Sequence, residues 1–434
     1  MTTEGGAGAP GLAPKGFIGT GRAAALFCAV IMVTHGFGNG LVPALLPRIG
    51  ESFGSGYGAL GLAVSSGLLA YGLGAAVGVR VVDVFPLRGI ILAALSVCVV
   101  GFLVAVWSTS PLVLAGSVVL ISLLAPISWS ASVRLIARVV EPSSLGRVTV
   151  VASSGAGVGG GINGAFAFFL ARPDEWRLAF VVATAVSAVT ALAILLSLPG
   201  TPASRPRLAR TTVRQRDWRA TWAVRTGRVV ILLSVAAGVG AFTFVSYMSA
   251  TAVDEFGVSP AGVAVLWWIA SSVGLTAAVV MGAWSDRVSP VLVIGVISLA
   301  YSSGLLVLVL TWSYAGLMVA ALGFGFFNYP IWGLLGHLAG QGMEPRLAVR
   351  AFSGGLTAAA WCAVSGIALA GWWIERTGSF RIPVIVLAVL SSLVTGWLVT
   401  EYARRRVGAV FQHPPSIGVE GPERAAGAGT ENAR

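Results

Sequence analysis

Residues 282–290 read GAWSDRVSP, and residues 77–85 read VGVRVVDVF, a degraded version of the same pattern. Each stretch carries an aspartate, Asp286 or Asp83, next to a long apolar run. The two aspartates are 203 positions apart (286 − 83 = 203). Charge kept at this spacing in so apolar a chain indicates that the two stretches occupy equivalent places in a repeated unit.

The same offset relates other short motifs. It joins EPSSLGR at 141–147 to EPRLAVR at 344–350, and it joins Phe53–Gly54 to Phe256–Gly257. Each match falls at the same place relative to the end of an apolar run. The sequence therefore predicts two similar halves, an organisation that many secondary transporters share.

The composition indicates a membrane protein. The chain has 434 residues, of which 56% are hydrophobic and only 10% are charged, and its mean hydropathy is +0.88. A soluble domain carries about a quarter charged residues, so lipid is the predicted solvent. The net charge of +12 does not indicate nucleic-acid binding, because the basic residues lie between apolar runs and form no patch with base-reading side chains.

The cysteines give no sign of a metal or a disulfide framework. Cys28, Cys98 and Cys362 all lie inside apolar runs and have no metal-binding spacing. We interpret them as small apolar packing residues. No cofactor and no metal are expected.

Charged side chains divide the chain into apolar runs of the length that a membrane-spanning helix needs, about 20 residues. Two runs have double length and break at WSTSP (107–111) and TWS (311–313), which brings the total to twelve spans. The predicted fold class is an all-α membrane protein with twelve transmembrane helices in two six-helix repeats. The single runs are 23–47, 52–79, 148–171, 178–204, 229–253, 256–285, 351–374 and 382–400, and the double runs are 89–133 and 288–343.

The basic residues predict the orientation, since cytoplasmic loops carry an excess of Lys and Arg. With the N-terminus in the cytoplasm, the outer segments hold only Arg48, Arg172, Arg177, Arg376 and Arg381. The inner segments then hold 23 of the 28 Lys and Arg residues (28 − 5 = 23). Both termini are therefore predicted to be cytoplasmic, in a multi-pass protein of the cell membrane.

Five regions follow from this division. We expect a disordered N-terminus over 1–21, a six-helix bundle over 22–200, an Arg-rich cytoplasmic linker over 201–228, a second bundle over 229–403 and a disordered tail over 404–434. The linker is interpreted as a solvated segment that its arginines hold inside, with lipid binding or regulation as the alternative.

Several motifs resemble those of the Major Facilitator Superfamily of transporters. GAWSDRV at 282–288 resembles the family's G-x-x-x-D-R loop motif between the second and third helices of a half. WRLAF at 176–180 resembles the start of the family's sixth helix, and SSGAGVGGGING at 153–164 resembles its glycine-rich fifth helix. Near the end of that helix the antiporter form of the family has Gly-Pro, where this chain has Asn163–Gly164.

The resemblance covers roughly residues 22–403. It implies a transporter similar to the bacterial efflux permeases, whose two halves rock about a site at their interface.

The loop aspartates lie at predicted cytoplasmic helix ends. A helix N-terminus presents free N–H groups and a positive dipole, which favour a carboxylate. We expect Asp286 to approach the start of the eleventh span, with Gly282 allowing the helices to come close, and Asp83 to approach the start of the fifth span. Our hypothesis is that these contacts latch the cytoplasmic side in the outward-open state; the alternative is that the charges only fix topology. The gating-loop candidates are Asp83, Arg88, Arg134, Arg147, Gly282, Asp286, Arg287 and Arg350.

Polar residues deep in a span usually face a cavity or a partner helix. His35 and Asn39 lie one turn apart in the first span, near its middle. His35 is a candidate proton carrier because histidine changes charge near neutral pH; a hydrogen-bonded structural histidine and a direct substrate contact are the alternatives. The substrate-cavity candidates are His35, Asn39, Trp129, Asn163, Phe242, Ser246, Tyr247, Trp267, Asn328, Tyr329, Trp332 and Trp361.

These candidates predict an aromatic pocket with few polar anchors. They include neither a cluster of acidic side chains that could bind a metal nor a deep pair of arginines that could bind an anion. The expected substrate is a small neutral or amphipathic organic compound. We expect secondary active export coupled to protons, by a monomer in the lipid bilayer. Uptake symport or facilitated diffusion of a small metabolite is the alternative on the same scaffold, and a non-transporting receptor or scaffold is the alternative from another class. An enzyme is not expected, because clustered catalytic carboxylates, an HExxH motif and a Ser/His set at one depth are missing.

Overall fold

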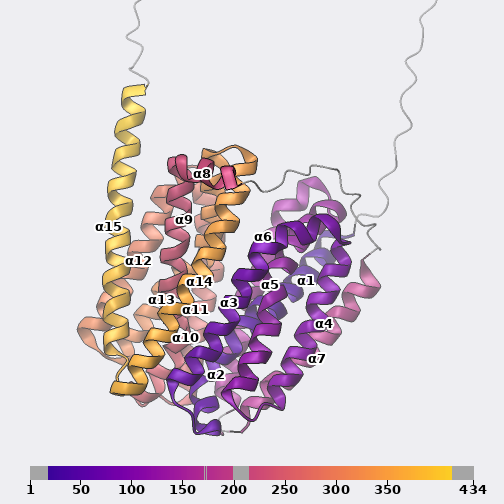
Figure 1. The fold of residues 1–434 in the computed structure, drawn as a ribbon, viewed down its shortest axis with the longest axis vertical. Coiled ribbons are helices and arrows are strands. Elements are labelled where there is room, and N and C mark those ends of the chain that lie inside the picture. Colours follow the sequence, from indigo (N-terminus) through magenta and orange to yellow (C-terminus); the bar gives the residue numbers. More distant parts are fainter. Residues whose placement is uncertain (1–17, 171, 173, 199–214, 413–434) are drawn as a thin grey trace, which may run out of the picture.

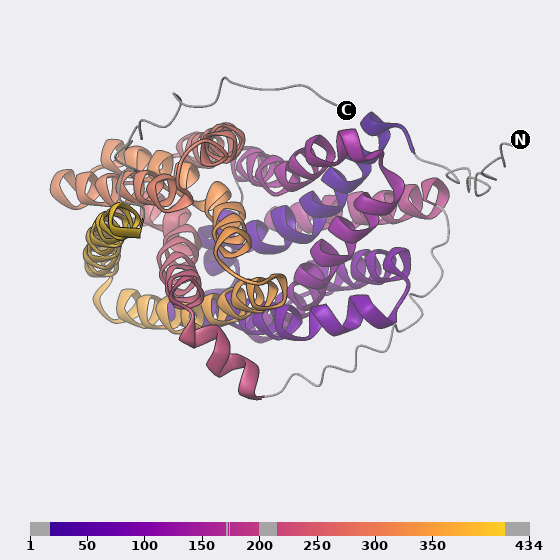
Figure 2. The same cartoon turned by 90° about the horizontal axis from the view of Figure 1, so that it is seen from above.

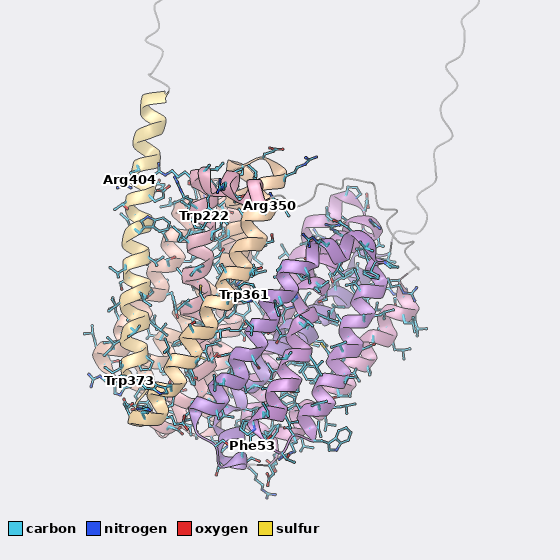
Figure 3. All side chains as sticks on the ribbon, in the orientation of Figure 1. Phe53, Trp222, Arg350, Trp361, Trp373 and Arg404 are labelled. Atoms are coloured by element: carbon cyan, nitrogen blue, oxygen red, sulfur yellow. The ribbon has the colours of Figure 1, made fainter. Side chains whose placement is uncertain are left out.

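The computed structural model describes residues 18–170, 172, 174–198 and 215–412. Within this part of the chain the regular structure is helical, and no strand is present. Figure 1 shows the helices in two groups, one from each half of the sequence. We call the end of the bundle that carries α8 and Arg350 the linker side, and the end with Phe53 and Trp373 the far side (Figure 3).

The helices of the first half follow the predicted spans. The first span consists of three consecutive segments, an α-helix, a π-helix and a second α-helix. The elements are α1 (Thr20–Ile31), η1 (Met32–Phe37), α2 (Gly38–Phe53), α3 (Tyr57–Val84), α4 (Leu87–Val106), α5 (Pro111–Val139), the 3-10 turn η2 (Pro142–Ser144), α6 (Leu145–Phe169) and α7 (Trp176–Ser197).

A short helix, α8 (Gln215–Ala223), precedes the second half. The seventh span again starts as an α-helix, which π-helical segments interrupt. The elements are α9 (Arg225–Ala237), η3 (Gly238–Phe242), α10 (Thr243–Ala250), η4 (Thr251–Glu255), α11 (Pro260–Ser285), α12 (Pro290–Thr311), α13 (Tyr314–Gly342), α14 (Pro345–Thr377) and α15 (Arg381–Gln412).

The predicted breaks of the two double-length runs are confirmed, since α4 ends at Val106 before Pro111 starts α5, and α12 ends at Thr311 before Tyr314 starts α13. Among the described residues, eleven helices are long and apolar enough to cross a membrane. The predicted span that is missing from these eleven is the fifth, which corresponds to α6 and has 25 residues. It falls outside the eleven because its sequence is rich in glycine and serine, which lower its hydropathy. Instead of facing lipid along its length, α6 packs against α1 and η1 on one side and against α11 on the other.

The 203-residue repeat is visible in the backbone. Gly54 and Gly257, which the offset relates, both end their spans in the left-handed region with a φ of 60°. Ser110 and Ser313, also related by the offset, each cap a helix by accepting a backbone N–H three residues on, from Val113 and Gly316. Equivalent residues thus make equivalent turns because each half repeats the same sequence of helix ends.

Two π-helical segments, one in the first span of each half, are also related by the repeat. η1 (Met32–Phe37) contains His35, and η3 begins at Gly238, which is 203 positions later (238 − 35 = 203). A π-segment leaves one backbone turn wider than an α-helix, and such turns are frequent at functional sites. The first span of each half is therefore distorted at the level where the site was predicted.

Among the described residues, three helix pairs make the most extensive contacts between the halves: α3 with α14, α6 with α11, and α2 with α10. The halves lie side by side in both views (Figures 1 and 2). The α2–α10 contact joins the parts of the first and seventh spans that are nearer the far side. In Figure 1 the halves meet there and diverge toward the linker side.

Two region boundaries differ from the expectation. α9 begins at Arg225 and not at 229, and α15 continues to Gln412, past residue 403. Arg225 belongs to the bundle because its Nη2 atom pairs with Oε2 of Glu401 at 2.7 Å, and the Glu401 side chain is only 4% exposed. Residues 1–17, 199–214 and 413–434, which include most of the expected disordered ends and half of the linker, lie outside the described residues.

Candidate functional site

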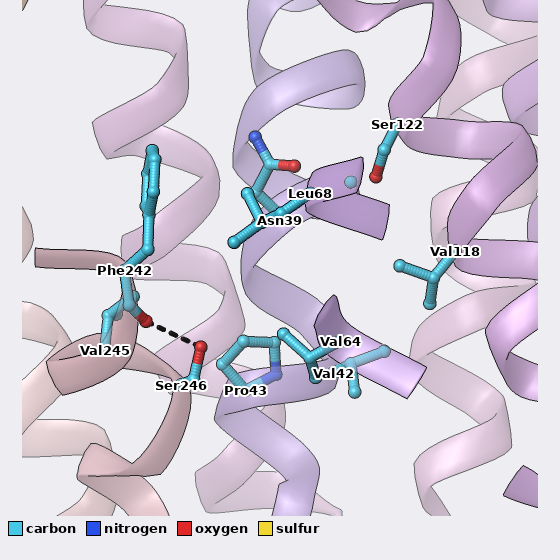
Figure 4. A pocket seen from close by; sticks show the side chains of 11 residues that line it. Asn39, Val42, Pro43, Val64, Leu68, Val118, Ser122, Phe242, Val245 and Ser246 are labelled. Carbon is cyan, nitrogen blue, oxygen red and sulfur yellow. Dashed lines mark hydrogen bonds between the residues drawn. The ribbon is translucent and has the colours of Figure 1, made fainter. Parts of the chain in front are cut away.

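A pocket lies at the contact between the halves, where α2 approaches η3 and α10. Figure 4 shows Asn39 and Ser122 of the first half on one side of it, with Phe242 and Ser246 of the second half on the other. Apolar side chains form the rest of the wall: Val42, Pro43, Val64, Leu68, Val118 and Val245. The pocket measures about 30 Å³, which holds one or two water molecules. A larger molecule therefore needs the halves to separate here.

His35 sits in η1 and has two polar neighbours. The Thr34 hydroxyl donates to the Val30 carbonyl oxygen at 2.9 Å, so its oxygen is left to accept from His35 Nδ1–H at 2.9 Å. The other ring nitrogen, Nε2, faces the Tyr71 hydroxyl at 3.5 Å. This network assigns the proton of neutral His35 to Nδ1 and leaves Nε2 free to take a second proton.

Aromatic rings surround His35 on two sides. Tyr71 of α3 and Trp129 of α5 both meet the imidazole edge to face, with ring centroids at 6.0 Å and 6.5 Å. Sequence reasoning included Trp129 but missed Tyr71. Tyr71 is 36 residues from His35, so no local spacing joins them; the signal that could have found it is a lone polar aromatic residue deep in the second span.

Asn163 lies in the first half but does not line the pocket. It is completely buried, and its Nδ2 donates to the Gly36 carbonyl oxygen at 2.9 Å. This carbonyl belongs to the π-helical segment η1, so Asn163 fixes α6 to the distorted turn beside His35. Its buried Oδ1 has no hydrogen-bond partner among the described residues.

The second half contributes an aromatic pair next to the pocket. Phe242 stacks on Trp332 of α13 with ring centroids 5.8 Å apart and an angle of 14° between the ring planes. Asn328 lies one turn before Trp332 on the same helix, and its buried Oδ1 lacks a hydrogen-bond partner in the described part of the chain. This face offers a flat apolar surface and an amide acceptor.

Three of the predicted residues satisfy their polar groups within the second half. Ser246 donates to the Phe242 carbonyl oxygen at 2.6 Å. Tyr247 donates to the Ile367 carbonyl oxygen at 2.9 Å, and Trp267 Nε1 donates to Ser249 Oγ at 3.0 Å. Tyr247 and Trp267 are buried, so both hold helices together in this conformation.

Two predicted residues reach across the interface between the halves. Trp361 of α14 donates from Nε1 to the Leu69 carbonyl oxygen of α3 at 3.3 Å, and it is still 43% exposed. Tyr329 of α13 lies against α6, where a β-carbon on Gly157 would be 3.4 Å from the tyrosine ring. Both contacts must change if the halves rock.

Three loop residues of the first half, Asp83, Arg88 and Arg134, have partners within that half. Arg134 bonds to Asp83, and Arg88 donates to the Leu195 carbonyl oxygen at the end of α7. In the second half the position equivalent to Arg134 is His337, which contacts Ser285, the residue before Asp286, at 3.0 Å. Each half therefore uses the same position on its fourth span to hold the loop after its second span.

The helix packing favours partners for the aspartates other than the expected ones. α3, which carries Asp83 in its last turn, packs on α14, and α11, which Asp286 follows, packs on α6. The expectation assigned these partners the other way round, within single halves that move as units.

In this conformation the linker-side groups of the second half are open to solvent. Asp286 and Arg287 are exposed, and a β-carbon on Gly282 would have no atom within 4 Å. The expected close approach at Gly282 is therefore not made here. Arg147, at the start of α6, is also exposed, and Arg350 is half-buried.

Among the described residues, no group of three or more His, Cys, Asp or Glu side chains comes together. The site that remains is an interface between two repeated bundles, with a small pocket, an aromatic pair and one histidine. Such a site defines a secondary transporter of the repeated-half type.

The family comparison agrees with this class. The family model of the Major Facilitator Superfamily matches residues 28–355. The chain therefore belongs to the Major Facilitator Superfamily of transporters, and it is a multi-pass protein of the cell membrane. No curated protein sequence matches it significantly.

Solved transporters share the fold. A D-xylose-proton symporter superposes with a TM-score of 0.73 and 13% identity, covering 88% of this chain and 97% of that one. The nucleoside transporter NupG superposes with a TM-score of 0.69 and 11% identity, covering 88% of this chain and 98% of that one. The third is a bacterial homolog of the human lysosomal transporter Spinster in an inward-facing, unoccupied conformation. It superposes with a TM-score of 0.67 and 15% identity, covering 87% of this chain and 96% of that one. At these identities the likeness concerns the fold alone.

Proposed function

We propose that this protein exports a small neutral or amphipathic organic compound across the cell membrane by alternating access, coupled to protons. The observation that carries the proposal is the pocket in which Asn39 and Ser122 of one half face Phe242 and Ser246 of the other. Its lining has hydroxyl, amide and aromatic groups and no charged side chain. A neutral molecule fits such a lining because a buried unpaired charge is strongly disfavoured.

The proposed coupling site is His35. Nε2 takes the proton, because Nδ1 already donates to Thr34. Protonation turns Nε2 from an acceptor into a donor, so the bond from Tyr71 must reverse or break. His35 is one turn from Asn39 on the same span, and a charged imidazole beside the pocket disfavours an apolar substrate there. Proton and substrate would thus exclude one another, which is what exchange of the two requires.

The orientation proposed from the basic residues puts the linker side in the cytoplasm. On that basis the two halves meet on the outer side and diverge toward the cytoplasm in the present conformation (Figure 1). An exporter in this state takes its substrate from the cytoplasm or from the inner leaflet.

Uptake is the second candidate. It is favoured by the fold neighbours whose names describe proton symport, for D-xylose and for fucose. The two directions differ in one measurable respect, since an exporter moves substrate against an inward proton flow and a symporter moves it along that flow.

Proteoliposomes with an imposed pH gradient test the proposal. The panel contains neutral amphipathic aromatics, nucleosides and sugars, and thermal shifts of the purified protein narrow it first. We expect one compound of the first group to exchange against protons, and His35→Ala to lower its gradient-driven flux by at least about tenfold, the scale of losing one proton-transfer group. Counterflow without a gradient should survive in His35→Ala. Unchanged gradient-driven flux would rule out the proton-carrier role, and co-transport of sugar or nucleoside with protons would favour uptake.

A further inference from the structure

The far side of the protein is closed by contacts between α3 of the first half and α14 of the second. α3 begins at Tyr57 after Gly56, it has no side-chain cap and it has no acidic residue in its first turn. Its N-terminus therefore supplies no hydrogen-bond acceptor of its own for the free N–H groups.

A carboxylate from the other half lies against this helix end. The carboxyl carbon of Glu375, near the end of α14, is 2.9 Å and 3.1 Å from the places where β-carbons would stand on Gly56 and Gly58. Glycine at both positions makes the room for it. One turn before Glu375 on α14, a β-carbon on Gly371 would lie 2.7 Å from the Tyr57 carbonyl oxygen, so the two helices are in backbone contact here.

A second bond closes the same corner. The Tyr57 hydroxyl donates to Oδ2 of Asp254 at 2.5 Å, which joins α3 to η4 of the second half. The Tyr57 ring also meets Phe380 edge to face, with centroids 5.4 Å apart. Glu375 and Asp254 thus bring two carboxylates of one half to the first turn of a single helix of the other.

We propose that Glu375 is the positioning residue that holds the far side closed, by placing its carboxylate against the uncapped N-terminus of α3 across the interface between the halves. The carboxylate meets the positive end of the α3 dipole only while α14 lies on α3, so it stabilises this conformation and not the opposite one. This role rests on the alternating access of the proposed function but on neither its substrate nor its direction.

Spin-label distances across the linker side measure the effect without a substrate. Gly146 and Gly340 suit the labels, because both are exposed, lie in different halves and have no atom within 4 Å of an added β-carbon. With cysteines there and the three native cysteines replaced by alanine, Glu375→Gln should raise the population with a closed linker side by about fivefold, the scale of one exposed carboxylate at a helix N-terminus.

The matched control is Glu51→Gln. Glu51 is an exposed carboxylate on the far side that pairs with Arg48 of its own helix, so its loss should leave the distances unchanged. Glu375→Asp keeps the charge and should recover part of the wild-type distribution. Distances in Glu375→Gln that equal those of the wild type would overturn the proposal.

A cross-link gives a second, independent measurement. A β-carbon on Gly58 would lie 3.8 Å from Cβ of Glu375, the separation that disulfides prefer. We expect the pair Gly58→Cys and Glu375→Cys to form a disulfide on oxidation, to fix the label distances in the linker-side-open state and to release them on reduction. If the linker-side-open and linker-side-closed populations both remain after oxidation, the proposed role of the contact between Glu375 and α3 would be contradicted. The spin-label and cross-linking measurements use no substrate, so they test the role of Glu375 even if the proposed substrate or transport direction is wrong.

Discussion

Replacing Gly159 with alanine is expected to destabilise the protein strongly, whereas the same change at Gly161, two residues along α6, should leave it at least as stable as before. A β-carbon on Gly159 would lie 2.6 Å from the Cα atom of Gly36. This obstacle is backbone of η1 and cannot turn away. A β-carbon on Gly161 would have no atom within 4 Å.

The physical reason is that α6 and η1 touch backbone to backbone. Relieving the clash means moving one helix away from the other, which separates the Asn163–Gly36 hydrogen bond as well. Overpacking of this kind costs up to about 3 kcal/mol. At Gly161 the helix gains about 0.5–1 kcal/mol from the better helix propensity of alanine.

Thermal unfolding of the two purified variants, followed by intrinsic fluorescence, checks this pair. The melting temperature should fall by several degrees for Gly159→Ala and stay or rise for Gly161→Ala. Equal melting temperatures would mean that α6 can shift without loss, and the interpretation of α6 as a helix buried between two neighbours would be wrong.

Asp286→Ala is expected to reduce transport by about tenfold while leaving the melting temperature unchanged. Asp286 is exposed in this conformation, so its removal should change stability by no more than about 0.5 kcal/mol. When the linker side closes, the end of α11 approaches the start of α6, where free N–H groups and Arg147 favour a carboxylate. Removing it weakens the closed state alone, by up to about 2 kcal/mol.

Flux of the compound found in the substrate panel and thermal unfolding are measured on the same preparations. Glu141→Ala is the matched control, because Glu141 is another exposed carboxylate on the linker side, in the turn before α6. It should transport as the wild type does. If Asp286→Ala also transports normally, the latch hypothesis fails and Asp286 only fixes topology.

Much of the site was within reach of the sequence, because polar residues are rare in this chain and costly in lipid. His35, Asn39 and Ser246 could be selected on that ground, and the structure places them at or beside the interface between the halves. Tyr71 and Ser122 could not be joined to them, since contacts between different spans leave no spacing in the sequence. For the same reason Asn163 looked like a cavity residue, although it holds α6 to η1.

The sequence by itself determined the membrane setting, the helix ends and the two-fold repeat. These depend on local chemistry: apolar runs must span lipid, capping serines begin helices and glycines end them. Gly54 and Gly257, 203 positions apart (257 − 54 = 203), accordingly make equivalent left-handed turns. Only the tertiary structure decided which helices of the two halves touch. It packs α3 on α14 and α11 on α6 and places Glu375 against the start of α3, because the contact between two helices depends on how whole bundles pack and not on the residues next in the chain.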